Sequence, residues 1–117
     1  MARAGENLKE PSAKSKQIID TFLDTLWMER GLSDNTLSAY RSDLYKYAIW
    51  LQEQNVELCH VESELILSYL GSFAKNSVRT VARRLSSLRR LYEHLLREGQ
   101  IKHNPVSNVD APRLGRS

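Results

Sequence analysis

The chain has 117 residues, which is enough for one small domain with a modest core and too few for two full domains. Hydrophobic residues make up 41% and charged residues 26%, a composition typical of a folded globular protein and not of a disordered chain. No apolar run approaches the roughly 18 residues of a membrane span, and the polar start lacks the apolar stretch of a secretory signal. The single cysteine, Cys59, excludes an intrachain disulfide and fits a reducing compartment.

Charge is unevenly distributed along the chain, although the net charge is only +3. Residues 1–74 carry 7 Lys or Arg and 11 Asp or Glu, a balance of −4. Residues 75–117 carry 10 Lys or Arg and 3 Asp or Glu, a balance of +7. A basic half on a nearly neutral chain indicates a polyanion that contacts one face, and a solvated charged face is the alternative.

The first predicted helix covers residues 15–30 and overlaps the end of a polar stretch, residues 1–16, that we expect to form a flexible leader. Gly31 is its stop signal. Trp27 and Met28 flank its apolar stripe and are expected to widen it. The stripe itself recurs at helical spacing and should be buried; it consists of Ile18, Ile19, Phe22, Leu23 and Leu26.

The second predicted helix covers residues 34–54 and begins after Ser33, a favourable N-cap residue. Its apolar face consists of Leu37, Tyr40, Leu44, Tyr47, Ala48 and Leu51. A shorter third helix is expected over residues 62–74. Its apolar side consists of Leu65, Ile66, Tyr69, Leu70 and Phe73.

The fourth predicted helix covers residues 78–98, with Gly99 as its stop signal. Its apolar stripe is the longest in the chain and consists of Val78, Val81, Ala82, Leu85, Leu88, Tyr92, Leu95 and Leu96. Asn104-Pro105 then ends regular structure, and residues 106–117 are expected to form a linker. Four amphipathic helices with short connections and no convincing strand predict an all-α four-helix bundle.

A strip of basic and polar residues runs beside the apolar stripe of the fourth helix. Its members follow i, i+4, i+7, i+11 spacing and are Arg79, Arg83, Ser86 and Arg90; Arg97 continues the strip seven residues further on. Such a strip could lie along a DNA major groove, where arginine binds phosphates or guanine, and a solubilising face is the alternative. Arg84 and Arg89 lie nearer the apolar arc, where we expect them to extend along it or to pair with acids.

The start of the second helix is a second candidate contact. Ser33, Asn35 and Thr36 offer side-chain hydrogen bonds beside unpaired backbone N–H groups, an arrangement that suits a phosphate. Plain N-capping accounts for Ser33 as well and is the favoured interpretation from this pattern alone.

Catalytic patterns find little support. His94 and Arg97 form an H-x-x-R string, but it is embedded in the fourth helical pattern. The tyrosines lie inside predicted helices without an activating basic cluster; they are Tyr40, Tyr45, Tyr47, Tyr69 and Tyr92. There is no phosphate-binding glycine-rich loop and no convincing set of metal ligands, so we expect no catalytic residue, metal or cofactor.

Several segments together resemble the amino-terminal core-binding domain of XerC/XerD-type tyrosine site-specific recombinases, in the phage integrase family. The long segment of residues 22–44, FLDTLWMERGLSDNTLSAYRSDL, resembles the family's opening, in a form more similar to XerD than to XerC. Residues 84–92, RLSSLRRLY, resemble its last long helix. Asn104-Pro105 and residues 111–113, APR, resemble its exit towards the catalytic domain. The resemblance covers about residues 17–114.

This resemblance implies a SAM-like core-binding domain over residues 17–105, one half of a clamp around double-stranded DNA. Its second and fourth helices would face the major groove. Carried over residue by residue, the resemblance implies DNA contacts by Asn35, Thr36, Arg41, Arg79, Thr80, Arg83, Ser86 and Arg90. The catalytic domain, the other half of the clamp, would follow residues 106–117 and is absent, so this chain is not expected to cleave DNA.

By the same implication, the parent enzyme acts in the cytoplasm with partner recombinase protomers, through a 3′-phosphotyrosyl intermediate, and resolves chromosome dimers for cell division. A mobile-element integrase would share the domain. A helical protein–protein module is the second hypothesis, with Ile49 and Trp50 as candidate exposed residues. A stand-alone helix-turn-helix regulator is weaker, for want of a short recognition helix and a dimerisation element. No membrane or small-molecule partner is expected.

Overall fold

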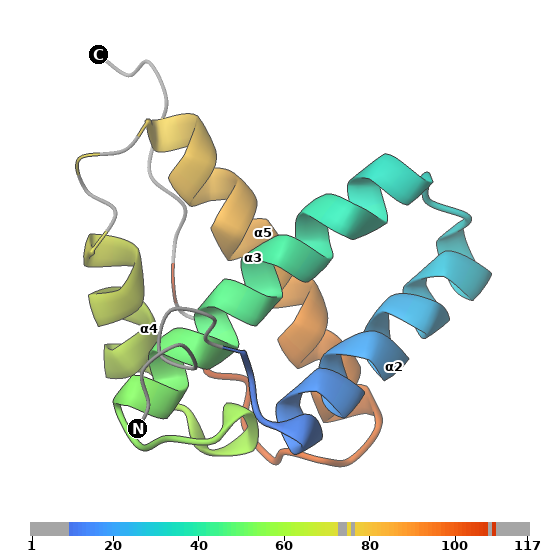
Figure 1. Cartoon of the computed structure of the whole chain (residues 1–117). Helices are drawn as coiled ribbons and strands as arrows, with labels where there is room; N and C mark the ends of the chain where they lie inside the picture. Colours follow the sequence, from blue (N-terminus) through green and yellow to red (C-terminus); the bar gives the residue numbers. More distant parts are fainter. Residues whose placement is uncertain (1–9, 73–74, 76, 108, 110–117) are drawn as a thin grey trace, which may run out of the picture. The chain divides into compact units, whose positions relative to one another are not determined.

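The computed structural model describes residues 10–72, 75, 77–107 and 109. In chain order its helices are α2 (Ala13–Arg30), α3 (Asp34–Glu53), the short 3-10 helix η1 (Leu58–His60), α4 (Ser63–Gly71) and α5 (Val78–Arg97) (Figure 1). Every regular element in these residues is helical, so the predicted all-α class is confirmed. The chain divides into two compact units, residues 1–58 and 59–117.

In the first unit, α2 and α3 pack against each other, and the chain reverses between them at residues 31–33 (Figure 1). The predicted stripes supply the core, apart from Ile18, Leu37 and Tyr40, which are half-buried. Buried hydrophobic side chains in this unit are Ile19, Phe22, Leu23, Leu26, Leu44, Tyr47, Ala48, Leu51 and Leu58.

The prediction that Trp27 and Met28 widen the α2 stripe is wrong, since their exposed fractions are 55% and 76%. Both residues follow Leu26, the last buried position of the helix. Each residue turns the helix by about 100°, so one or two steps beyond Leu26 carry the side chain off the packed face. Trp27 and Met28 are therefore not part of the packed stripe.

Helix α2 begins at Ala13, two residues earlier than predicted, because Ser12 caps it: the Ser12 hydroxyl accepts a hydrogen bond from the Ser15 backbone N–H at 3.2 Å. Residues 13–16, placed in a leader from the sequence, are thus helical. Residues 1–9 of that predicted leader lie outside the described residues.

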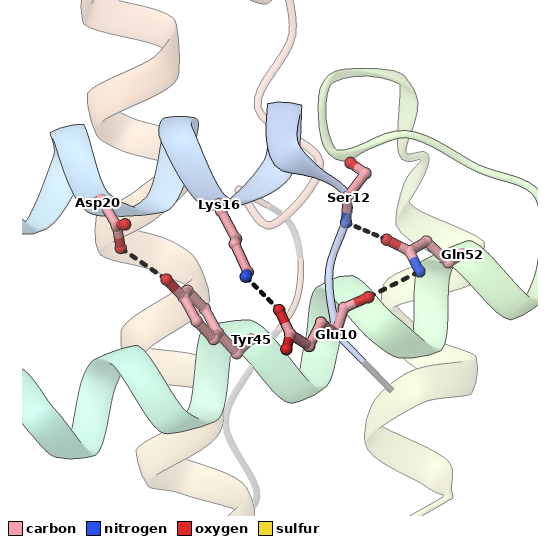
Figure 2. Close-up of polar contacts among 6 residues, drawn as sticks. All are labelled: Glu10, Ser12, Lys16, Asp20, Tyr45 and Gln52. Atoms are coloured by element: carbon pink, nitrogen blue, oxygen red, sulfur yellow. Dashed lines mark hydrogen bonds and ion pairs between the residues drawn. The ribbon is translucent and has the colours of Figure 1, made fainter. Parts of the chain in front are cut away.

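A set of polar contacts joins the start of α2 to the end of α3 (Figure 2). The Gln52 side chain accepts a hydrogen bond from the Ser12 backbone N–H and donates one to the Glu10 carbonyl oxygen at 3.2 Å. Lys16 pairs with Glu10, and Lys14 pairs with Glu57 at 3.2 Å. The two bonds to one amide fix the chain that enters α2 against the last turn of α3.

In the second unit, α4 and α5 bury most of their predicted stripes, together with three residues beyond α5. The buried apolar residues are Ile66, Tyr69, Leu70, Val81, Leu85, Leu88, Leu91, Tyr92, Leu95, Ile101, Val106 and Val109. The predictions for Val78 and Leu96 are wrong, because these side chains are 37% and 41% exposed. Leu91, which was left out of the stripe, is fully buried, although it lies at the edge of the stripe.

The segment after α5 is packed where a linker was expected to start. The Ser63 hydroxyl donates a hydrogen bond to the Pro105 carbonyl oxygen at 2.8 Å, and the Asn104 side chain accepts one from the Val106 backbone N–H at 3.0 Å. Val106 and Val109 are buried. Residues 108 and 110–117 of the predicted linker lie outside the described residues.

Predicted helix ends agree with the structure to within one to three residues, as is usual when caps are ambiguous. Helix α3 ends one residue earlier than expected, and so does α5. Helix α4 starts one residue later and ends at Gly71; Phe73 and Ala74, which were assigned to it, lie outside the described residues.

Replacing Gly31 with alanine should lower the free energy of unfolding by about 1 kcal/mol, because Gly31 ends α2 with a left-handed φ of 62°. Gly71 is the matched control: it is helical, and a Cβ at either glycine meets nothing within 4 Å. Gly71→Ala should instead stabilise by about 0.5 kcal/mol or more. Urea denaturation measures both, and equal effects would contradict the assigned end of α2.

Candidate nucleic-acid interface

Ser77 fixes the start of α5 and hence the direction of every side chain along it. Its hydroxyl accepts a hydrogen bond from the Thr80 backbone N–H at 3.1 Å and donates one to the Thr80 hydroxyl at 3.0 Å. This cap satisfies backbone donors of the first turn and sets the register of the helix.

The predicted strip is present on α5, where Arg79, Arg83, Ser86 and Arg90 fall within an arc of about 60°. The first three are exposed and Arg90 is half-buried. We call these four residues the arginine strip. Thr80, the other candidate on this helix, lies about 100° away from Arg79 and is half-buried beside the cap.

The local charge on α5 is strongly positive. The helix carries six arginines and one acidic residue, Glu93, and has no acid in its first turn. Like charges four residues apart repel each other on a helix, and few acids on the same helix offset this repulsion. An external anion would relieve it, which favours the DNA interpretation over a solubilising face of mixed charge.

Two other arginines of α5 are used inside the second unit. Arg84 donates a hydrogen bond to the Tyr69 hydroxyl at 3.2 Å, and Arg89 donates one to the Val109 carbonyl oxygen at 2.6 Å. Both side chains are half-buried, as expected for residues beside the apolar arc. Both bonds are made to neutral oxygens, in agreement with the first of the two expectations, that these side chains extend along the apolar arc.

The start of α3 repeats the cap found at the start of α5. The Ser33 hydroxyl accepts a hydrogen bond from the Thr36 backbone N–H at 3.2 Å and donates one to the Thr36 hydroxyl at 3.1 Å. The capping interpretation of Ser33 is therefore confirmed. Asn35 is exposed in the same turn, and Thr36 is half-buried.

Arg41 lies on another side of α3, about 120° around the axis from Asn35, so the structure does not bring it beside the first-turn residues. Its Nε donates a hydrogen bond to Asp20 Oδ1 of α2 at 3.4 Å. The Tyr45 hydroxyl donates to the same oxygen at 2.9 Å (Figure 2). Burial raises the pKa of Tyr45, and its hydrogen bond to Asp20 raises the pKa further.

Asp20 was not singled out in the sequence, where it looks like an ordinary surface acid on a helix. Its partner residues, Arg41 and Tyr45, lie more than 20 positions away on another helix. Only the opposite charges on two neighbouring predicted helices could have suggested the contact, and they do not select this pair over others.

The residues weighed for catalysis do not form an open site. His94 is only 4% exposed, whereas Arg97 three residues later is exposed, so the H-x-x-R string is divided between core and surface. Tyr47, Tyr69 and Tyr92 are buried in the core. Within the described ranges, no group of three or more His, Cys, Asp or Glu could hold a metal ion, and no helix is long and apolar enough to cross a membrane.

Comparison with known proteins points to one family. Residues 19–99 match the family model described as phage integrase, N-terminal SAM-like domain. The chain is 45% identical over 104 residues to tyrosine recombinase XerD of Shewanella oneidensis and 46% identical over 101 residues to that of Pseudomonas putida. Each comparison covers 85% of this chain and 34% of the relative.

The chain thus spans about a third of the length of the curated relatives that it matches. Tyrosine recombinase XerD of Pseudomonas aeruginosa is matched in the same proportions at 42% identity. The helices and the family match agree on the type of domain. The chain belongs to the family of phage integrase N-terminal SAM-like domains, and the relatives that it matches include XerD tyrosine recombinases.

Proposed function

We propose that this domain binds double-stranded DNA at a recombination half-site, as one half of the clamp that a tyrosine recombinase closes around its site. The observation that carries the proposal is the arginine strip on α5, three of whose members are exposed on a helix with a single acid. A major groove is wide enough to admit such a helix, and arginine can bind phosphate or guanine there. The catalytic domain of the parent enzyme would form the other half of the clamp.

The proposed contacts on α5 are Arg79, Thr80, Arg83, Ser86 and Arg90, and those on α3 are Asn35, Thr36 and Arg41. The arginines supply the charge that neutralises phosphates. Asn35 and the first turn of α3 supply short polar groups and backbone N–H donors, which bind phosphate oxygens without reading the sequence. Most of the affinity should then come from phosphates and should depend on salt.

The parent reaction that we propose is strand exchange between paired sites through a 3′-phosphotyrosyl intermediate, in the bacterial cytoplasm and together with partner recombinase protomers. Resolution of chromosome dimers is the proposed role, because the relatives matched are named XerD recombinases. A mobile-element integrase is the alternative parent, because it would use the same domain on the same kind of DNA.

Fluorescence anisotropy tests the DNA proposal, with a labelled duplex that carries a Xer-type half-site and a scrambled duplex of equal length. We expect tighter binding to the half-site and a linear fall of log affinity with log salt, by about 0.9 for each phosphate neutralised. An isolated half-clamp should bind weakly, so the titration starts at low salt. Absence of binding to both duplexes at low salt would contradict the proposal.

A protein–protein module is the second candidate, and one observation favours it. Trp27 and Met28 are large apolar side chains that are more than half exposed near the end of α2. Ile49 and Trp50, the residues considered for this role from the sequence, are only half-buried and are weaker candidates. If the domain does not bind DNA, but associates with itself in analytical ultracentrifugation and loses this association in the Trp27→Ala variant, this second function replaces the first.

A further inference from the structure

Asp20 is placed so that it acts directly on one of the proposed DNA contacts. Its Oδ1 atom accepts a hydrogen bond from Arg41 Nε at 3.4 Å and a shorter one from the Tyr45 hydroxyl at 2.9 Å. Arg41 and Tyr45 lie one turn apart on α3, whereas Asp20 comes from α2. All three residues belong to the first compact unit, so the cluster is defined within that unit.

The Arg41–Asp20 pair is open to solvent, because the exposed fractions of the two side chains are 44% and 46%. An ion pair of this exposure is weak and can be displaced by a competing anion. This contact is made through Nε, and the guanidinium group carries two further amino groups that can donate to another acceptor. Guanidinium charge is nevertheless delocalised, and a carboxylate on Nε offsets it for any phosphate that approaches.

Tyr45 keeps the carboxylate in this position. Its hydroxyl makes the shorter of the two bonds and comes from a half-buried side chain of α3. Without that bond, Asp20 could rotate into solvent when a phosphate arrives. With it, the negative charge stays beside Arg41 and repels the phosphate that Arg41 would bind.

We infer that Asp20 is a positioning residue that lowers the affinity of this domain for duplex DNA, by holding Arg41 and by opposing the phosphate that Arg41 binds. The inference rests on the proposed DNA-binding function and adds a residue that lowers the affinity for DNA. Such restraint would weaken binding to the half-site and to other duplexes alike, because contacts to phosphates carry no sequence information.

The test compares Asp20→Asn with Asp24→Asn in the intact 117-residue chain, by anisotropy against the half-site duplex at about 50 mM salt. Asp24 is exposed one turn further along α2, so both variants remove one negative charge from the same helix. Asp20→Asn should tighten binding about threefold, the affinity equivalent of a half-exposed ion pair. Asp24→Asn should change the affinity for the duplex by less than about 1.5-fold.

The same pair of substitutions in an Arg41→Gln background shows whether Asp20 acts through Arg41. There, Asp20→Asn should have no larger effect than Asp24→Asn, because the charge that Asp20 offsets is gone. Thermal melting of each variant separates a change in affinity from a change in folded fraction. A gain in affinity that depends on Arg41 cannot come from structural damage.

Two failures of this experiment have different meanings. If the unsubstituted domain binds DNA but Asp20→Asn binds no more tightly than Asp24→Asn, the inference about Asp20 is overturned and the proposed function stands. Weaker binding by Asp20→Asn overturns the inference too, because the carboxylate would then be orienting Arg41 for the phosphate. If the unsubstituted domain binds neither duplex, the proposed function fails and the inference fails with it.

Discussion

Replacing Arg79 and Arg83 together with alanine should lower the affinity for the half-site duplex by about a hundredfold at low salt, or roughly tenfold for each charged contact. Both side chains are exposed on the first two turns of α5. The slope of log affinity against log salt should fall by about 1.8, because each phosphate contact contributes about 0.9. Circular dichroism should show the same helix content, since alanine favours a helix at least as well as arginine.

The matched control replaces Arg30 and Lys46 with alanine. These residues are exposed on α2 and α3 and lie outside the proposed contacts. Their substitution removes two positive charges, as the Arg79 and Arg83 substitutions do. The control should lose less than about threefold in affinity, through the weaker general attraction of the domain to DNA. If the two double variants bind equally, net charge and not the arginine strip explains the affinity, and α5 is not the contact helix.

Replacing Leu91 with alanine should lower the free energy of unfolding by about 2–5 kcal/mol, the range observed when a large buried side chain is truncated and a cavity remains. Leu91 is fully buried in the second unit, whereas Leu67 of α4 is 56% exposed. Leu67→Ala, the same chemical change at an exposed position, should shift stability by no more than about 0.5 kcal/mol. Urea denaturation followed by circular dichroism measures both variants.

The effect of Leu91→Ala on DNA binding distinguishes a residue that supports the fold from one that contacts DNA. A domain of this size has a stability of about 5–15 kcal/mol, so Leu91→Ala could leave a measurable unfolded fraction. Binding should then fall only in proportion to that fraction, and the salt slope should stay unchanged, because Leu91 contacts no phosphate. A cost below about 1 kcal/mol for Leu91→Ala would show that α5 is not packed through this residue.

Helix positions and the arginine strip were predictable from the sequence because both are local properties. Apolar residues at helical spacing indicate a helix. Ser33 and Ser77 indicate where α3 and α5 begin, because each serine caps its helix through a bond to the residue three positions on. Once α5 is a helix, its 3.6-residue turn alone places Arg79, Arg83 and Arg90 in one strip. Neither conclusion needs a neighbouring element.

Burial at the edges of a stripe needed the neighbouring elements. Periodicity treats Trp27, Leu91 and Leu96 as similar apolar residues close to a stripe, yet Leu91 is fully buried and the other two are largely exposed. What separates them is whether another element packs over that side of the helix. A helix pattern read alone contains no information about where its neighbour ends.

The sequence by itself therefore determined the all-α class, the family resemblance, and a basic strip on the last long helix. Only the tertiary structure decided how the remaining charges are used, because their partners are distant in the chain. Arg89 reaches the Val109 carbonyl oxygen and so binds a segment that was expected to be a linker. Arg41 and Tyr45 meet Asp20 only because α3 packs on α2, which brings side chains 21 and 25 positions away along the chain to one carboxylate oxygen.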